Sequence, residues 1–208
     1  MISKNINIAY WNNQLKERSP EEIINWALGL TENRVVTTSF GIYSAVLLNT
    51  FFNQDKDIRV IWCDTGYNTP DTYRHSTNLI EKFDLNVHKF SPLQTSAYTD
   101  ATLGIPDIND PKHAEFTEIV KLEPFRRAFR ELDPEMWFTN IRVRQTEYRS
   151  SKDILSVNNN GVLKVSPFYY WTDEQLEAYL ISHSLPKNNS YYDPTKVLSH
   201  RECGIHFQ

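Results

Sequence analysis

The chain alternates short, continuous apolar runs with longer stretches in which apolar residues recur at helical spacing. Runs rich in Val, Ile, Trp and Phe are typical of buried strands, and they cover residues 34–38, 58–63, 85–90 and 136–141. Stretches with helical character separate them and cover residues 20–30, 45–52, 70–83 and 115–132. Because right-handed crossovers join parallel strands and carry the helices, this order predicts an α/β fold. We expect a three-layer sandwich with a mostly parallel sheet covered by helices on both faces.

Local signals mark where individual helices begin. Ser19 precedes Pro20 and Thr69 precedes Pro70, the arrangement of an N-cap followed by proline at the first helical position. Thr172 begins a capping box at the start of another helix. Before the first helix, the stretch that contains Tyr10 is expected to form a packed arm. We also expect a long loop at 91–111 with at most a short helix. Further along the chain we expect a hairpin turn at 158–161, a strand at 162–170 and a helix that ends near 182.

Length, charge and hydropathy restrict the class of protein. The 208 residues are enough for one domain, which we expect at 1–186, followed by a mobile C-terminal tail at 187–208. A formal net charge of −4 gives no general attraction to nucleic acid. No apolar run reaches the ~18 residues of a membrane-spanning helix, and the first residues lack the apolar core of a secretory signal. We therefore expect a cytoplasmic protein that binds neither nucleic acid nor membrane.

The chain has two cysteines, Cys63 and Cys203. Two thiols cannot supply the four thiolates that hold an iron–sulfur cluster within one chain, so no cluster is expected. A structural disulfide is not expected in a reducing compartment. Cys63 ends an apolar run and is interpreted as a buried strand residue.

The last nine residues carry the clearest candidate chemistry. Cys203 lies among polar and charged residues, and nearby cations such as Arg201 or a protonated His206 lower the pKa of a thiol and increase its nucleophilicity. Two other interpretations remain open from the residues alone. The thiol is an incidental tail residue, or His200, Cys203 and His206 are metal ligands, although a structural zinc site needs four ligands.

The terminal motif Arg-Glu-Cys-Gly-Ile-His resembles the catalytic signature of the phosphoadenosine phosphosulfate (PAPS) reductases. Two loops that follow predicted strands are also similar to that family. They are the pyrophosphate loop Ser39, Phe40, Gly41 and Ile42, and the segment that begins Asp64, Thr65 and Gly66. Arg142, Gln145 and Arg149 match a third family pattern, and three arginines within 142–149 suit a polyanion.

The resemblance implies a function and the roles of individual residues. Cys203 is the expected nucleophile, which takes a sulfonate from PAPS, and a thioredoxin or glutaredoxin then releases sulfite. Substrate binding is expected from both loops, from the arginine segment, and from Arg201 and His206 in the tail. No metal is implied, and a homodimer is possible, as in relatives.

The chain also departs from the family pattern. Asn140 stands where the family has Gly, and Val143 and Arg144 replace an arginine and an acid. A longer family segment with a Gly-Asp-x-x-Thr-Thr-like motif is missing between 187 and 200, which bears most on recognition of the 3′-phosphate.

Other readings of the sequence remain open. They are an enzyme specific for adenylyl sulfate (APS), an ATP pyrophosphatase-type enzyme, whose loop has Asp where Tyr43 stands, and a non-catalytic nucleotide-binding module. Arg126, Arg127 and Arg130 are interpreted as a solvated helix face.

Overall fold

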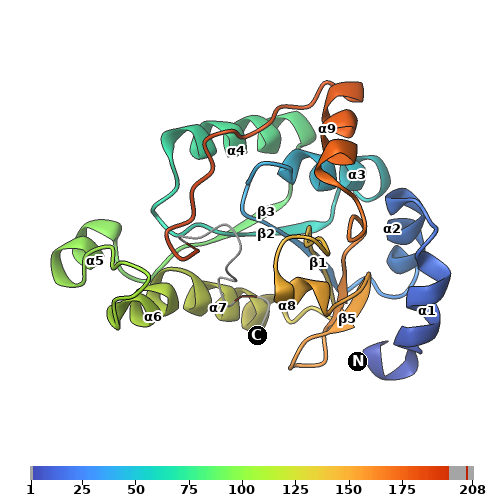
Figure 1. Cartoon of the computed structure of the whole chain (residues 1–208), viewed down its shortest axis with the longest axis horizontal. Helices are drawn as coiled ribbons and strands as arrows, with labels where there is room; N and C mark the ends of the chain where they lie inside the picture. The colour runs from blue at the N-terminus through green and yellow to red at the C-terminus, as the bar shows by residue number, and fades with distance from the viewer. Residues whose placement is uncertain (1, 197–204, 206–208) are drawn as a thin grey trace.

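The computed structural model describes residues 2–196 and residue 205, and a six-stranded sheet forms its centre (Figure 1). The strands lie in the order β3-β2-β1-β4-β6-β5, and all neighbours are parallel except β5 and β6. Their bounds are β1 Arg34–Thr38, β2 Arg59–Cys63, β3 Val87–Phe90, β4 Met136–Phe138, β5 Leu155–Val157 and β6 Leu163–Val165. The predicted mostly parallel α/β sheet is confirmed.

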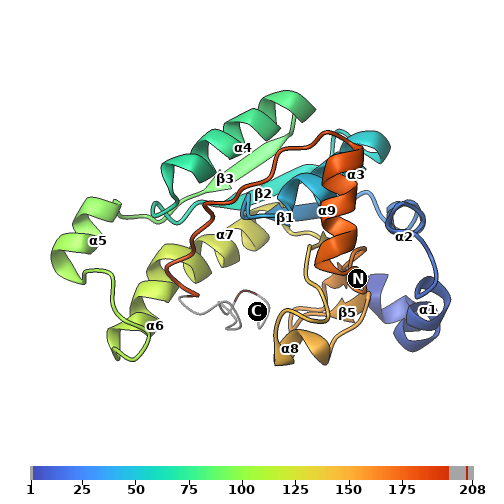
Figure 2. The same ribbon diagram turned by 45° about the horizontal axis from the view of Figure 1, so that its top comes forward.

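Helices cover both faces of this sheet and complete the predicted three layers (Figure 2). On one side lie α3 (Ser44–Gln54), α4 (Pro70–Phe83) and α9 (Asp173–Ser182), and on the other lies α7 (Glu123–Leu132). Near the N-terminus, α1 (Ile8–Leu15) and α2 (Pro20–Leu28) follow the short helix η1 (Ile2–Asn5).

Side chains alternate between the two faces along each strand, as the pleat requires. In β1, Val36 belongs to the core beneath α3 and α9, whereas Val35 packs in a second core with Phe125 and Ala128 of α7. Both valines are fully buried. A sheet buried on both faces explains why its strands read as continuous apolar runs.

The helix starts marked in the sequence are confirmed. Ser19 and Glu22 form a complete capping box at the start of α2. Thr69 Oγ1 accepts a hydrogen bond from the amide of Thr72 at 3.1 Å at the start of α4. Thr172 forms a capping box with Gln175 at the start of α9.

The stretch predicted as one helix at 115–132 consists of three segments. They are α6 (Lys112–Thr117), a π-helical turn η2 (Glu118–Leu122) and α7. The π turn carries Lys121, whose side chain is buried. Single π turns within helices occur frequently at functional sites. The 91–111 stretch contains one short helix, α5 (Ser96–Thr102), as predicted.

The interpretation of Arg126, Arg127 and Arg130 as a solvated face is wrong for Arg127. Its guanidinium donates to Ser91 O at 2.6 Å and to Glu123 at 2.9 Å, and its side chain is 20% exposed. Arg126 and Arg130 are exposed, as expected. Arg127 therefore joins α7 to the segment after β3.

Residues 187–196, called the strap below, follow α9 and cross the carboxyl edge of the sheet (Figure 1). Asn188 Nδ2 donates to Phe40 O at 2.8 Å and to Thr72 Oγ1 at 3.0 Å. At the far end, Lys121 pairs with the buried carboxylate of Asp193. These contacts hold the first half of the predicted tail against the sheet, and residues 197–204 and 206–208 lie outside the described part of the chain.

Among the described residues, no helix is long and apolar enough to cross a membrane.

Candidate active site

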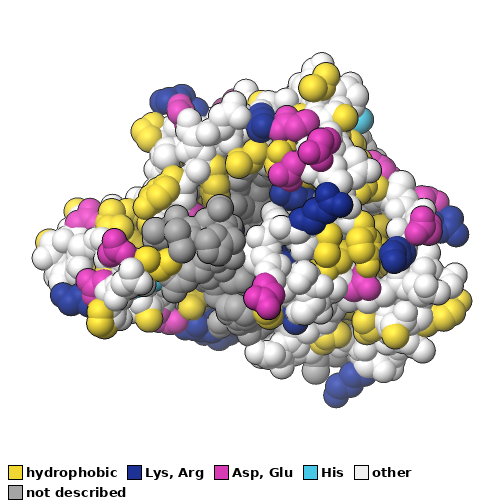
Figure 3. Space-filling view, in the orientation of Figure 1, with side chains coloured by type: hydrophobic (Ala, Val, Ile, Leu, Met, Phe, Trp, Pro, Cys, Tyr) yellow, Lys and Arg dark blue, Asp and Glu magenta, His cyan; other side chains and the backbone are white. Residues whose placement is uncertain are grey.

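A cleft of about 970 Å³ opens at the carboxyl ends of the parallel strands. It lies where the connections after β1 and β4 diverge to opposite sides of the sheet, the switch point at which open α/β sheets bind ligands. Its walls come from the loops after β1 and β4, the start of α9, the strap, η2 and Ile205. Figure 3 shows acidic and basic side chains next to one another on the face around α9.

The loop after β1 forms the floor of the cleft with Ser39, Gly41 and Ile42. Phe40 has a left-handed backbone, φ +50°, and its fully buried ring lies edge-on to Trp62 with centroids 4.9 Å apart. The buried ring fixes a turn that most residues disfavour. A Cβ on Gly41 would lie 3.4 Å from Ser39 Oγ and 3.6 Å from the ring of Tyr191. The strap thus closes over this turn at contact distance.

The start of α3 differs from most other helix starts of the described chain. Side chains of Asn7, Ser19, Thr69, Thr95, Thr146 and Thr172 accept hydrogen bonds at the starts of α1, α2, α4, α5, α8 (Glu147–Ser150) and α9. At α3 the N-cap is Tyr43, whose side chain makes no capping hydrogen bond. Backbone oxygens accept from two first-turn amides instead: Ser44 N donates to Gly41 O at 3.1 Å and Val46 N to Tyr43 O at 3.3 Å. The positive end of this helix therefore lies at the cleft without a side-chain cap, as in anion sites at helix starts.

The loop after β4 brings two buried arginines to the opposite wall. Arg142 and Arg149 are 8% and 6% exposed. Gln145 Oε1 accepts from the Arg142 amide at 2.9 Å and from the guanidinium of Arg149, so one amide side chain orients both residues. Arg142 also donates to Asp173 Oδ1 at 3.1 Å. All three predicted residues of this segment line the cleft.

Burial and pairing set the electrostatics of this wall. Burial lowers the pKa of Arg142, while the charge of Asp173 opposes the shift. Burial and a hydrogen bond to Glu177 raise the pKa of Tyr43 to about 12, so its hydroxyl is a donor at neutral pH. Arg144, exposed at the rim of the cleft, adds a further cation. The cleft thus offers cations from one side and the positive end of α3 from the other, a combination suited to a polyanion.

Four residues predicted to contact ligand do not line the cleft of the described chain: Phe40, Asp64, Thr65 and Gly66. Asp64 Oδ1 instead accepts from the amide of Gly66 at 3.1 Å, from Asn68 and from Tyr73. Gly66 has φ +80°, a conformation that favours glycine. These contacts shape the turn before α4, and a ligand role for this segment stays a prediction. Cys203, Arg201 and His206 lie outside the described residues.

Several cleft residues were not proposed as ligand contacts from the sequence: Tyr43, Lys121, Asp173, Tyr191 and Lys196. Asp173 was visible only as a first-turn acid of α9. Tyr43 stood out only as a replacement for Asp in a related loop. Cys63, interpreted as a buried strand residue, is half-buried and also lines the cleft. Its position at the carboxyl end of β2 accounts for this, because that edge of the sheet forms the cleft.

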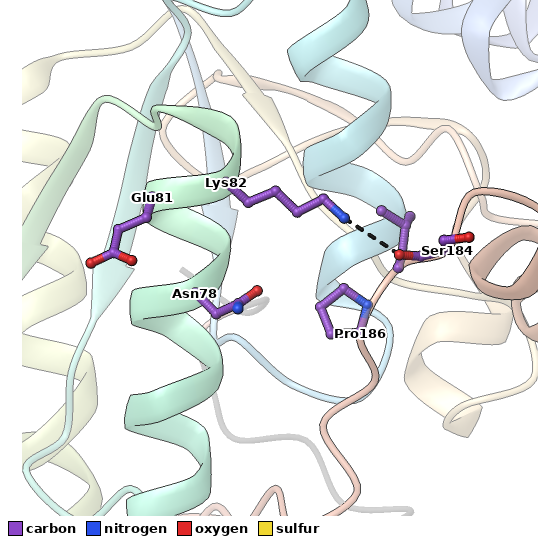
Figure 4. Close-up of a pocket in the computed structure, with 6 residues that line it drawn as sticks. Asn78, Glu81, Lys82, Ser184 and Pro186 are labelled. Atoms are coloured by element: carbon purple, nitrogen blue, oxygen red, sulfur yellow. Dashed lines mark hydrogen bonds between the residues drawn. The ribbon is translucent and has the colours of Figure 1, made fainter.

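A second hollow lies between α4 and the segment that joins α9 to the strap (Figure 4). Its lining is Asn78, Glu81, Lys82, Ser184, Leu185 and Pro186, and Lys82 Nζ donates to Ser184 O at 3.4 Å. Its lining shares no residue with that of the cleft. No group of three potential metal-ligating side chains occurs among the described residues.

Comparisons with known proteins agree with this geometry. Residues 33–194 match the model of the phosphoadenosine phosphosulfate reductase domain. The phosphoadenosine 5′-phosphosulfate reductase of Vibrio atlanticus is 36% identical over 176 residues, 84% of this chain and 68% of that protein. The enzyme of the same name from Zymomonas mobilis is 37% identical over 177 residues, 84% of this chain and 72% of that protein.

Solved structures give the same result. The crystal structure of phosphoadenylyl-sulfate reductase from Candida auris, a phosphate complex, superposes with a TM-score of 0.77, 25% identity and 87% coverage of both chains. The tRNA thiolase NcsA of Methanococcus maripaludis, at 13% identity and a TM-score of 0.60, covers 88% of this chain and 67% of that one and shares the fold alone. The chain belongs to the phosphoadenosine phosphosulfate reductase family.

Proposed function

We propose that this protein reduces 3′-phosphoadenylyl sulfate to sulfite and adenosine 3′,5′-bisphosphate. The observation that carries the proposal is a cleft with two buried arginines, Arg142 and Arg149, opposite the uncapped start of α3. The names of the curated relatives support the same reaction.

The two walls of the cleft would bind the anionic groups of the substrate. The backbone of the loop of Ser39, Gly41 and Ile42 would donate to the phosphate oxygens, and the positive end of α3 would attract their charge. Arg142 and Arg149 would donate bidentately to the phosphosulfate, whose charge is spread over several oxygens. Both arginines are buried, and Asp173 holds the guanidinium of Arg142 while Gln145 holds that of Arg149. Little side-chain entropy is therefore lost when the anion binds.

The first chemical step is a sulfonate transfer to Cys203. The thiolate Sγ attacks the sulfonate sulfur, an S–S bond forms, and the bond from sulfur to the phosphate oxygen breaks. Its electron pair leaves with the adenosine 3′,5′-bisphosphate. Arg142 and Arg149 would stabilise the negative charge that grows on the leaving phosphate. The product on the protein is S-sulfocysteine.

The second step regenerates the enzyme with two electrons from a dithiol protein. A thiolate of thioredoxin or glutaredoxin attacks Cys203 Sγ, and sulfite departs with the electron pair of the S–S bond. The second thiol of the reductant then resolves the mixed disulfide and restores the Cys203 thiol. The reductant ends as a disulfide, and neither a metal nor an iron–sulfur cluster is required.

A sulfite-release assay with PAPS or APS, with and without a thioredoxin system, tests this function. We expect release from PAPS only when the reductant is present. Without reductant, intact mass should show one sulfonate added to the wild type and none to Cys203→Ser. Wild-type-like turnover by Cys203→Ser would refute the mechanism, and release from APS alone would refute the substrate.

A further inference from the structure

Tyr43, the N-cap residue immediately before α3, contacts three other segments of the chain. Its hydroxyl donates to Glu177 Oε1 of α9 at 2.9 Å. Its backbone oxygen accepts from Asn140 Nδ2, in the loop after β4, at 3.1 Å. Arg142 of that loop and Lys187 of the strap both lie over its ring. One half-buried side chain thus joins the loop after β1, the arginine segment, α9 and the strap.

The contact with Arg142 is suited to positioning an anion-binding group. The guanidinium carbon of Arg142 lies 5.1 Å from the centroid of the Tyr43 ring, within the range of a cation–π interaction. The face of an aromatic ring holds a guanidinium without occupying its N–H donors, which lie in the guanidinium plane. Asp173 takes one of these donors, and the others remain in the plane that an anion would approach.

Further contacts hold the ring and the backbone of Tyr43. Glu177 accepts from the hydroxyl and also pairs with Lys187, which lies 5.5 Å from the ring centroid. Asn140, which lies two residues before Arg142, ties the backbone of Tyr43 to the loop after β4. Asn140 replaces the glycine of the family pattern, and a glycine has no side chain with which to make this contact. The Tyr43–Asn140 hydrogen bond therefore links the two anion-binding walls directly.

We propose that Tyr43 is a positioning residue that holds Arg142 toward the anion-binding side of the cleft while leaving the start of α3 uncapped. The identity of the anion rests on the proposed function, but the positioning role does not. Tyr43 acts through Arg142 and contributes ring contact, not charge. Its removal should therefore weaken the binding of anions much more than that of an uncharged nucleoside.

The test is a double-mutant cycle on the full chain, with binding measured by calorimetry. The variants are Tyr43→Leu, Tyr43→Phe, Arg142→Met and the Tyr43→Leu/Arg142→Met pair. Ligands are adenosine 3′,5′-bisphosphate, pyrophosphate and adenosine. From the usual strength of cation–π contacts we expect Tyr43→Leu to weaken both anions roughly fivefold to twentyfold. Tyr43→Phe, which keeps the ring and loses only the hydroxyl, should stay within about threefold.

Coupling to Arg142 separates positioning from a general structural effect. In the Arg142→Met background, Tyr43→Leu should change anion affinity by less than about twofold, since the group it positions is gone. Equal losses in both backgrounds, or a Tyr43→Phe variant as weak as Tyr43→Leu, would overturn the inference.

Measuring more than one ligand distinguishes a failure of this inference from a failure of the proposed function. Binding of pyrophosphate but not of the bisphosphate by the wild type would count against the proposed substrate, and the cycle would still be decided with pyrophosphate. Binding of neither anion would overturn the inference itself.

Discussion

At the residue scale, Arg142 and Arg149 differ from the other arginines of the described chain in being both buried and directed to the cleft. Gln145 contacts both of them, so the three residues that match the family pattern form one unit. Arg126 offers a matched contrast, because it is exposed, pairs with Glu118 and does not line the cleft. Burial, not charge alone, distinguishes the two kinds of arginine.

We predict that Arg149→Met lowers kcat/KM for PAPS by roughly tenfold to a hundredfold, because a lost charged hydrogen-bonding partner costs about 1.5–3 kcal/mol. Arg126→Met should stay within about threefold, since exposed charges contribute little. Sulfite-release kinetics measure both, and melting curves show whether each variant is folded. An equal loss in both variants would mean that the anion site lies elsewhere.

Cys63 lines the same cleft but is the last residue of β2 and is not the expected nucleophile. We predict that Cys63→Ala retains turnover within about threefold and loses about 1 kcal/mol of stability, as expected for a small, half-buried group. Urea unfolding and sulfite release are the measurements, with Cys203→Ala as the inactive comparison. A folded but inactive Cys63→Ala protein would give this thiol a part in the chemistry.

At the element scale, the sequence predicted elements whose boundaries depend on local signals. The hydroxyl caps at Ser19, Thr69 and Thr172 fixed three helix starts, because a cap is a contact within four residues of chain. The π turn at 118–122 and the irregular strap were not predictable in this way. The two are joined by a tertiary contact, the ion pair between Lys121 and Asp193, which are 72 residues apart and carry no local signal for it.

The Lys121–Asp193 pair is buried and should contribute to stability in a pH-dependent way. Burial alone would raise the pKa of Asp193, but the charge of Lys121 and hydrogen bonds from Lys121 and Thr195 outweigh it and lower the pKa from its ordinary 3.8. An acid with a lowered folded-state pKa stabilises the protein fully above its unfolded pKa. That contribution is lost as the pH falls through the folded value.

We therefore predict that Asp193→Asn costs about 3–5 kcal/mol at neutral pH, because it leaves the buried Lys121 charge unpaired. The difference from wild type should narrow below pH 3.8, the ordinary pKa of this carboxyl, as Asp193 of the wild type takes up its proton. Urea unfolding across pH measures this. Asp71→Asn, which disrupts an exposed pair with Arg74, is the control and should change stability little. A difference that widens on acidification would contradict the prediction.

At the scale of the whole molecule, the strand–helix order predicted a parallel sheet, because crossover handedness leaves few alternatives. The order of the strands in the sheet, and hence the position of the cleft between β1 and β4, did not follow from local pattern. The contact between Tyr43 and Glu177, which are 134 residues apart, shows why. Residues that meet only after folding carry no periodicity or spacing that links them in the sequence.

Because the cleft is built from segments across the whole chain, ligand binding should stabilise the entire fold. A ligand at 100 times its Kd adds about 2.7 kcal/mol. For a domain of about 200 residues, each kcal/mol corresponds to roughly 2–4 °C in Tm. We predict that saturating adenosine 3′,5′-bisphosphate raises Tm by about 5–10 °C.

The Tm shifts produced by adenosine and adenosine 5′-phosphate at the same concentration show which phosphates the cleft binds. Adenosine lacks every group that Arg142, Arg149 and the start of α3 would bind, so its shift should be the smallest of the three. Adenosine 5′-phosphate keeps one phosphate, so its Tm shift should lie between the other two, because it makes fewer contacts with cleft cations such as Arg144. Arg149→Met should reduce the shifts of both nucleotides but not that of adenosine. Equal shifts for the mono- and bisphosphate would instead show that this cleft, with its short strap, does not read the 3′-phosphate and that the natural substrate is adenylyl sulfate.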